Sequence, residues 1–206
     1  MSTTPNDPAR FMRSRTQQSL VSALERVTLH RHLYLTAAQR CEDAGLHVVA
    51  HAFRFTAAQE KEHADIFRGL LRTFGGEQPA VTDAAEAPPH DAPLTLLHTA
   101  AQSEARSCGE LDPGYADIAG AEHYPHIATA FRRIAETEQL HSRRLRQYAQ
   151  ALQDGSLFSS SRRVGWLCLP CGHLHYGSDA PEHCGSCGRS RGHFIRSDFH
   201  PFTVAT

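Results

Sequence analysis

The sequence predicts a mainly α protein built as a four-helix bundle with one long crossover connection, followed by a small C-terminal metal-binding module. Four long segments carry apolar residues at three- and four-residue steps, the periodicity of an amphipathic helix. The connection between the second and third segments is long enough to run the length of a bundle. Two Cys-x-x-Cys pairs then lie near the end of the 206-residue chain.

The four helical segments are rich in Ala, Leu, Arg, Glu and Gln, which are good helix formers. Because their apolar residues recur along one face, each segment is expected to pack against the other three. The expected helices cover residues 16–43, 47–73, 94–121 and 124–153.

Glycine and proline mark the ends of these helices. Gly45 separates the first helix from the second, the Gly75-Gly76 pair ends the second, and Pro125 lies just inside the start of the fourth. The Pro113-Gly114 pair is expected to kink or interrupt the third helix. The stretch 75–93, with Gly, Pro, Ala, Asp and Glu and few apolar residues, is expected to be the crossover connection of a ferritin-like bundle.

An internal repeat supports a bundle of two related helical hairpins. The segment Ala50-His51-Ala52-Phe53-Arg54, followed by Glu60 and His63, recurs in the fourth helix as Ala128-Thr129-Ala130-Phe131-Arg132, followed by Glu138 and His141. We expect the bundle domain to span residues 1–155 and the metal domain 164–206. By composition, residues 154–161 between them predict a flexible linker.

Carboxylates occupy core-facing positions of the predicted helices. Glu60 and His63 fall on or beside the apolar stripe of the second helix, Glu104 falls on that of the third, and Glu138 and His141 on that of the fourth. A buried unpaired carboxylate is costly, so this pattern requires compensation. Two Glu-x-x-His pairs that converge in a four-helix core can provide it by binding cations.

Other interpretations of these carboxylates remain open. Single residues could be partly exposed, or could pair with an arginine such as Arg54 or Arg132. The first helix does not complete the set, because Val27 stands where its carboxylate would be and Glu25 should point away from the core. His30, one turn further on, is a possible substitute ligand, although a core histidine is the simpler interpretation.

The cysteine pairs predict a tetrathiolate site for zinc or iron, since two Cys-x-x-Cys turns can close a tetrahedron around one ion. A structural disulfide and unrelated cysteines are the alternatives. Neighbouring glycines at 172, 185 and 188 would permit the tight turns. The four expected ligands are Cys168, Cys171, Cys184 and Cys187.

The composition bounds the partners and the compartment. A formal net charge of −1 gives no reason to expect nucleic acid or an anionic membrane as a partner. Residues 1–10 lack the apolar run of a signal peptide, and no stretch reaches 18 consecutive apolar residues. Cys41 and Cys108 stand alone among helical residues, and Cys108 is expected to be a small buried apolar residue and not a redox thiol. We therefore expect a cytoplasmic protein.

Together the two parts resemble the rubrerythrin family, over residues 19–194. The C-terminal module is similar to the rubredoxin-like domain in its cysteine pairs, Gly172, the Ala180-Pro181-Glu182 segment and His193-Phe194. The segment 58–64 is typical of the family's second helix. The resemblance implies a non-haem di-iron centre that reduces hydrogen peroxide to water, with electrons supplied by an iron held in four thiolates.

The resemblance also implies site residues. Tyr34 matches a tyrosine near the metals, whereas Val27 and Ser107 stand where the family has two further glutamates, so one iron should be held less tightly. An electron-donor reductase and a homodimer or larger homo-oligomer are implied as partners. The alternatives are a non-catalytic electron-transfer or iron-binding protein with a degenerate bundle site, and a structural scaffold with zinc in the cysteine site. The implied iron ligands are Glu60, His63, Glu104, Glu138 and His141 in the bundle, and the four paired cysteines in the module.

Overall fold

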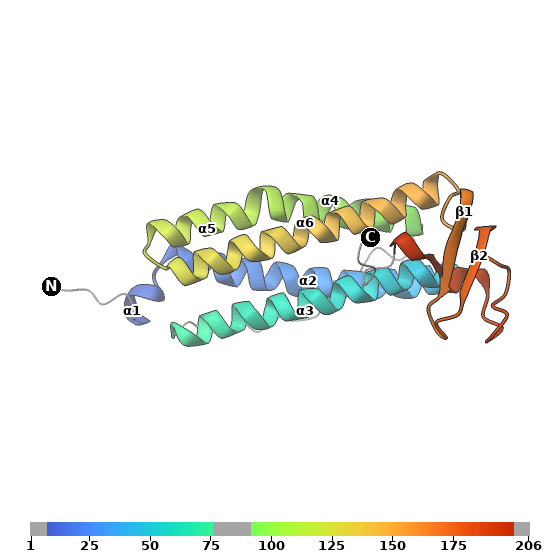
Figure 1. The fold of residues 1–206 in the computed structure, drawn as a ribbon. Coiled ribbons are helices and arrows are strands. Elements are labelled where there is room, and N and C mark those ends of the chain that lie inside the picture. The colour runs from blue at the N-terminus through green and yellow to red at the C-terminus, as the bar shows by residue number, and fades with distance from the viewer. Residues whose placement is uncertain (1–7, 76–91, 200–206) are drawn as a thin grey trace.

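The computed structural model describes residues 8–75 and 92–199. The long helices lie side by side as a bundle, and a small sheet covers one end of it (Figure 1). The predicted fold class is confirmed, and the helix bounds agree with the expected ones to within one residue, apart from the division of the third helix. The crossover expected over residues 75–93 lies largely outside the described residues. The helices are α1 (Pro8–Phe11), α2 (Arg15–Asp43), α3 (His47–Thr73), α4 (Pro93–Arg106), α5 (Asp112–Ala121) and α6 (Pro125–Gln153).

Two helical hairpins form the bundle. Helix α2 packs on α3, and the α4–α5 segment packs on α6. The turn between α2 and α3 needs glycine, because Gly45 has a φ of +72°, and Gly75 after α3 has a φ of +75°. Each predicted stripe faces the core, which is built mainly from Ala, Leu, Phe and Tyr side chains of these helices. Among the described residues, no helix combines the length and the apolar content that a membrane crossing requires.

The third helix contains a π-helical segment, Ser107–Leu111, that separates α4 from α5. The Asp112 N–H donates to the Ser107 carbonyl, the i to i−5 bond of a π-turn. Pro113 explains why the π-helical segment lies at this point of the helix. A proline has no N–H to donate, and in a regular helix the ring of Pro113 would clash with the carbonyl of Gly109. The extra residue turns Ser107 and Asp112 into the core and leaves Cys108 half-buried, so the expectation of a buried Cys108 was wrong.

The N-terminus of α2 is held by Glu122, which follows α5. Its carboxylate accepts hydrogen bonds from the Arg15 N–H at 3.1 Å, the Thr16 N–H at 2.8 Å and the Thr16 hydroxyl at 2.6 Å. These bonds satisfy N–H groups that have no partner within the helix. Burial alone would raise the pKa of Glu122, but the Thr16 and Arg15 hydrogen bonds lower it.

Replacing Glu122 with alanine is expected to lower the free energy of unfolding by about 1 kcal/mol at neutral pH, the usual cost of a lost helix cap. Because the folded-state pKa is lowered, this contribution is present above the unfolded pKa of about 4.3 and is lost as the pH falls through the folded value. Urea denaturation at pH 7 and pH 3 measures both. A matched Glu136→Ala substitution, at an exposed site on α6, should change little at either pH. An equal loss for Glu122→Ala at pH 3 would contradict the assignment.

The C-terminal module is a three-stranded antiparallel sheet in the order β2-β1-β3. Its small core contains Trp166, Ala180 and Phe194 together with two of the cysteines. The Trp166 indole N–H donates to the Gly177 carbonyl at 3.2 Å, which joins β1 to β2. The strands are β1 (Ser159–Cys168), β2 (Leu174–Asp179) and β3 (Phe194–Arg196).

The module packs on the end of the bundle, so the expectation of a flexible linker was wrong. Strand β1 begins at Ser159 within the proposed linker, and Leu157 is buried in the bundle core together with Ile195 of β3. The His193 ring stacks on the His47 ring with centroids 3.8 Å apart. Apolar residues inside a stretch rich in serine and glycine thus anchor the chain. The expected domain boundaries, with the bundle ending at residue 155 and the metal domain beginning at residue 164, stay a prediction.

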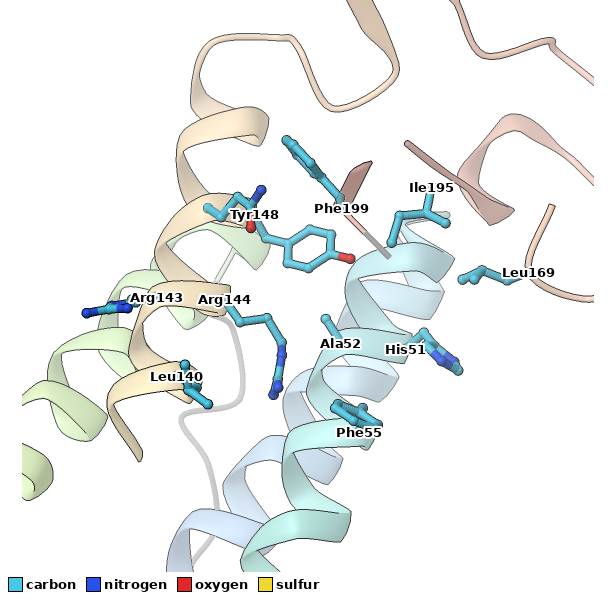
Figure 2. Close-up of a pocket in the computed structure, with 11 residues that line it drawn as sticks. His51, Ala52, Phe55, Leu140, Arg143, Arg144, Tyr148, Leu169, Ile195 and Phe199 are labelled. Carbon is cyan, nitrogen blue, oxygen red and sulfur yellow. The ribbon is translucent and has the colours of Figure 1, made fainter. Parts of the chain in front are cut away.

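A cleft of about 280 Å³ lies between α3, α6 and this module. Figure 2 shows Arg144 and Tyr148 of α6 on one side and Phe55 of α3 on the other, with Phe199 and Ile195 from the C-terminal module. The Arg144 guanidinium lies 4.7 Å from the Phe55 ring centroid and donates to Thr56 at 2.9 Å. None of the predicted metal ligands lines this cleft.

Candidate metal centres

All five predicted bundle ligands are buried on facing helices. Glu60, Glu104, Glu138 and His141 have no exposed surface, and His63 is 5% exposed. The π-helical segment begins only after Glu104, so the predicted register holds for this residue. The two halves of the repeat face each other, since the His63 and His141 rings stack with centroids 5.6 Å apart. Arg54 bonds Glu42 and Arg132 lies near Asp117, so neither of these arginines pairs with the cluster, but Glu138 does pair with another arginine, Arg26.

A first group of donors joins all four long helices of the bundle. His141 Nδ1 lies 3.0 Å from Glu60 Oε1 and 3.3 Å from Glu104 Oε2, and His30 Nδ1 lies 3.6 Å from Glu104 Oε1. Donor atoms of His30, Glu60 and Glu104 all lie within 4.8 Å of one another. His30, considered above only as a possible substitute, is therefore part of the cluster. The His30 ring is oriented by Ser103, whose hydroxyl lies 2.8 Å from Nε2.

A second group shares Glu60 with the first. Donor atoms of Glu60, His63 and Glu138 lie within 4.8 Å of one another, and His63 Nδ1 is 3.5 Å from Glu60 Oε2. Val27 and Ser107, where the family has two further carboxylates, are both buried. This second group therefore has fewer donors than the sequence pattern of a di-iron bundle requires.

Arg26 and Asp112 also belong to the site, and sequence reasoning missed both. Arg26 Nη1 donates to Glu138 Oε1 at 2.9 Å and Oε2 at 3.1 Å, while Nη2 donates to Asp112 Oδ1 at 2.5 Å. The Arg26 side chain is only 12% exposed, and Asp112 is fully buried. Regular helical periodicity does not place Asp112 in the core, because the π-helical segment changes the register before it. Pro113, the next residue, was the sequence feature that indicated an irregular helix at this point. Arg26, beside the stripe position of Val27, gave no signal of its own.

The donor atoms of the cluster lack other partners. Within the described part of the chain, both oxygens of Glu60, both ring nitrogens of His141, Glu104 Oε2 and the Nδ1 atoms of His30 and His63 have no hydrogen-bond partner. Buried polar atoms are normally satisfied, and each exception requires an explanation. A cation among these carboxylates and imidazoles would satisfy them, so the residues fit a bound metal ion.

The pKa values reflect the same imbalance of charge. Burial alone would lower the pKa of His141, but the Glu104 and Glu60 carboxylates raise it to about 8. A proton on His141 thus partly takes the place of the positive charge of a metal ion. Metal sites in general bind their ion more tightly once the ligands have lost their protons. Burial and the Asp112 carboxyl raise the pKa of Glu138 above its ordinary value, although Arg26 beside it acts in the opposite direction.

Tyr34 lies against the first group, as the sequence predicted. Its hydroxyl donates to Glu104 Oε1, and its ring packs between His30 and Phe53. Burial and the Glu104 carboxylate hold the pKa of Tyr34 well above its ordinary value. The hydroxyl therefore keeps its proton and orients the Glu104 carboxylate.

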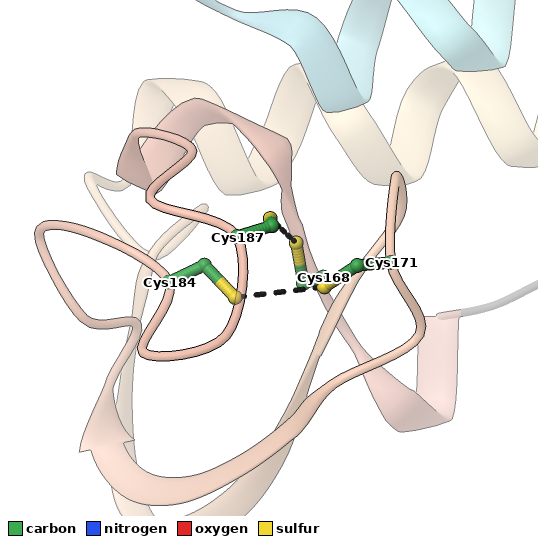
Figure 3. A group of neighbouring side chains, drawn as sticks. All are labelled: Cys168, Cys171, Cys184 and Cys187. Atoms are coloured by element: carbon green, nitrogen blue, oxygen red, sulfur yellow. Dashed lines mark hydrogen bonds between the residues drawn. The ribbon is translucent and has the colours of Figure 1, made fainter.

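The four paired cysteines come together in the C-terminal module (Figure 3). Cys168 and Cys187 have sulfurs 3.7 Å apart, and those of Cys171 and Cys184 are 3.6 Å apart. A tetrahedral ion with metal–sulfur bonds of about 2.3 Å places sulfurs about 3.8 Å apart, whereas a disulfide requires about 2.05 Å. The spacing fits a tetrathiolate metal site and excludes the disulfide alternative.

Two equivalent turns build this site. The Gly172 N–H donates to the Cys168 carbonyl at 2.8 Å and the Gly188 N–H to the Cys184 carbonyl at 2.9 Å. Both glycines have φ near +73° and are required there, whereas Gly185 does not have a positive φ and its expected role was wrong. Burial alone would raise the pKa of Cys184, but the N–H groups of Cys187 and Ser186 lower it to about 6 and favour its thiolate.

A ferritin-like bundle with a buried carboxylate and imidazole cluster, joined to a tetracysteine module, defines a class of two-site metalloproteins. Comparison with known families agrees. The rubrerythrin family model matches residues 20–149, and the rubrerythrin rubredoxin-like domain matches residues 166–195. The chain belongs to the rubrerythrin family.

Individual relatives support this assignment. The chain is 30% identical to rubrerythrin of Nitratidesulfovibrio vulgaris, covering 88% of this chain and 93% of the relative. It is 33% identical to rubrerythrin of Clostridium perfringens, covering 80% and 84%. In fold it is similar to fully reduced, all-ferrous nigerythrin, with a TM-score of 0.62 at 22% identity over 95% of this chain and 94% of that one. Desulfovibrio desulfuricans bacterioferritin gives a TM-score of 0.66 at 17% identity, covering 75% and 87%.

Proposed function

We propose that this protein is an oxidoreductase that reduces hydrogen peroxide to water at the bundle centre, with electrons relayed through iron in the tetracysteine site. The observation that carries the proposal is the presence, in one chain, of a buried and charge-unbalanced carboxylate and imidazole cluster and of four sulfurs at tetrahedral spacing. Membership of the rubrerythrin family supports an oxidoreductase of this kind. Bound iron would supply the electrons and would polarise the oxygens.

The protein residues would hold the centre. Glu60, Glu104 and His141 are the proposed ligands, Glu138 and His63 lie beside them, and Tyr34 holds the Glu104 carboxylate in place. Reduction of peroxide to two waters consumes two protons. No protein nucleophile is needed, and Cys108, whose thiol donates to the Ala105 carbonyl, has no place in the reaction.

The distance between the two sites favours an oligomer. The module contacts the start of α3 through His47, and Glu60 lies more than three turns further along the same helix. At 1.5 Å per residue this separates them by roughly 20 Å along the helix axis. We propose a homodimer or larger assembly in which the tetracysteine site of one protomer supplies a neighbour's bundle, with a reductase as the external donor in a reducing compartment.

Single-turnover oxidation tests the function. Protein with iron in both sites is reduced without oxygen and mixed with hydrogen peroxide, and the return of ferric thiolate absorption is followed by stopped flow. His141→Ala should slow this return at least about tenfold, since even losing a hydrogen-bond partner of a ligand costs 10- to 100-fold in metal affinity or activity. His126→Ala, at an exposed position on the same helix, is the matched control and should react as the wild type does.

Two outcomes favour the alternatives. A thiolate iron that stays reduced after peroxide is added would indicate a non-catalytic electron-transfer or iron-binding protein. Colourless protein with zinc in the cysteine site, found by metal analysis of anaerobically purified protein, would indicate a structural module.

A further inference from the structure

Two histidines lie against the Glu60 and Glu104 carboxylates, so that each of the four long helices contributes one side chain. His30 comes from α2, Glu60 from α3, Glu104 from α4 and His141 from α6. Each is at most 5% exposed, and each has at least one donor atom without a hydrogen-bond partner in the described part of the chain. Two imidazoles and two carboxylates suffice to hold one divalent ion.

The position beside this group is already occupied by a cation of the protein. The Arg26 guanidinium binds both oxygens of Glu138 through Nη1 and binds Asp112 through Nη2. Glu138 thus has little capacity left for a metal ion. The remaining donors there are His63 Nδ1 and Glu60, and Glu60 is shared with the first group.

The surrounding positions cannot replace the donors that Arg26 engages. Val27 offers no donor atom, and Ser107 offers only a neutral hydroxyl. A second divalent ion would also lie close to the positive guanidinium in a buried site, where like charges repel strongly. The arrangement therefore suits one metal ion and one arginine.

We propose that the bundle centre of this chain is mononuclear, with one divalent metal ion held by His30, Glu60, Glu104 and His141, and with the Arg26 guanidinium in the place of a second ion. His30 is then a metal ligand, and Asp112 positions Arg26. This proposal concerns metal content and does not depend on peroxide reduction, so either can fail alone.

Manganese(II) is a suitable probe because it prefers the carboxylate ligands of the bundle over the thiolates of the module. The full-length protein, with its tetracysteine site filled, is titrated with Mn²⁺ and followed by electron paramagnetic resonance. We expect one tightly bound ion per chain with the six-line signal of isolated Mn²⁺. Two bound ions with the multiline spectrum of a coupled pair would overturn the proposal without any variant.

Two matched histidine variants locate the ion. His30→Ala should weaken Mn²⁺ binding by at least about tenfold, because it removes one of four ligands. His63→Ala should change the affinity less than threefold, although both histidines are buried and lie near a glutamate. Loss of binding in His63→Ala, with full binding in His30→Ala, would contradict the assignment. Circular dichroism of both variants checks that they are folded.

Discussion

Replacing Arg26 with alanine is expected to lower the free energy of unfolding by about 3–5 kcal/mol, the cost of removing one partner of a buried ion pair. Glu138 and Asp112 are fully buried, and Arg26 donates to both. Without the guanidinium these carboxyl groups would face each other in the core with no positive charge beside them. Urea denaturation at neutral pH, with a chelator present, measures the effect.

Further variants separate this cause from general damage. Arg133→Ala, at an exposed position on α6, should change the free energy of unfolding by less than about 0.5 kcal/mol. Arg26→Lys should recover only part of the loss, because one ammonium cannot reproduce the two-pronged contact of a guanidinium. Excess Mn²⁺ should reduce the loss in Arg26→Ala, since a cation can pair with the released Glu138. A loss below about 1 kcal/mol in Arg26→Ala would show that this ion pair is not required.

Replacing Cys184 with serine is expected to remove the thiolate-to-iron absorption of the module and to leave the helix content of the bundle nearly unchanged. Loss of a thiolate ligand should weaken metal binding by more than the 10- to 100-fold seen for a lost hydrogen-bond partner of a ligand. The bundle has its own core of residues from all its long helices, so it should remain folded. Visible absorption, iron content and far-ultraviolet circular dichroism measure the three effects.

The matched control for this variant is Cys108→Ser. Cys108 is half-buried and its thiol donates to the Ala105 carbonyl, a bond that a serine hydroxyl can replace. This variant should keep the iron absorption, the helix content and the stability. A complete loss of helical signal in Cys184→Ser would mean that bundle and module fold as one unit. That outcome would give the contacts of Ile195 and His193 with the bundle a larger energetic role than we assign to them.

The sequence by itself determined the elements of this protein and most of the candidate ligands. Glu60 with His63, and Glu138 with His141, could be placed in the core because a helix repeats every 3.6 residues, and that periodicity is local. The tetracysteine site could be predicted for a similar reason, since each Cys-x-x-Cys turn positions two sulfurs through its own backbone. Such features need no knowledge of how distant segments pack.

The tertiary structure alone decided which charges meet in the core. The π-helical segment before Pro113 shifts the register by one residue, which turns Asp112 inward. Arg26 lies beside the apolar stripe, and only the position of Asp112 and Glu138 on other helices draws its guanidinium into the site. His30 likewise joins the cluster because Glu104, on another helix, lies within reach of its ring. These pairings depend on packing between helices, which the periodicity of one helix does not contain.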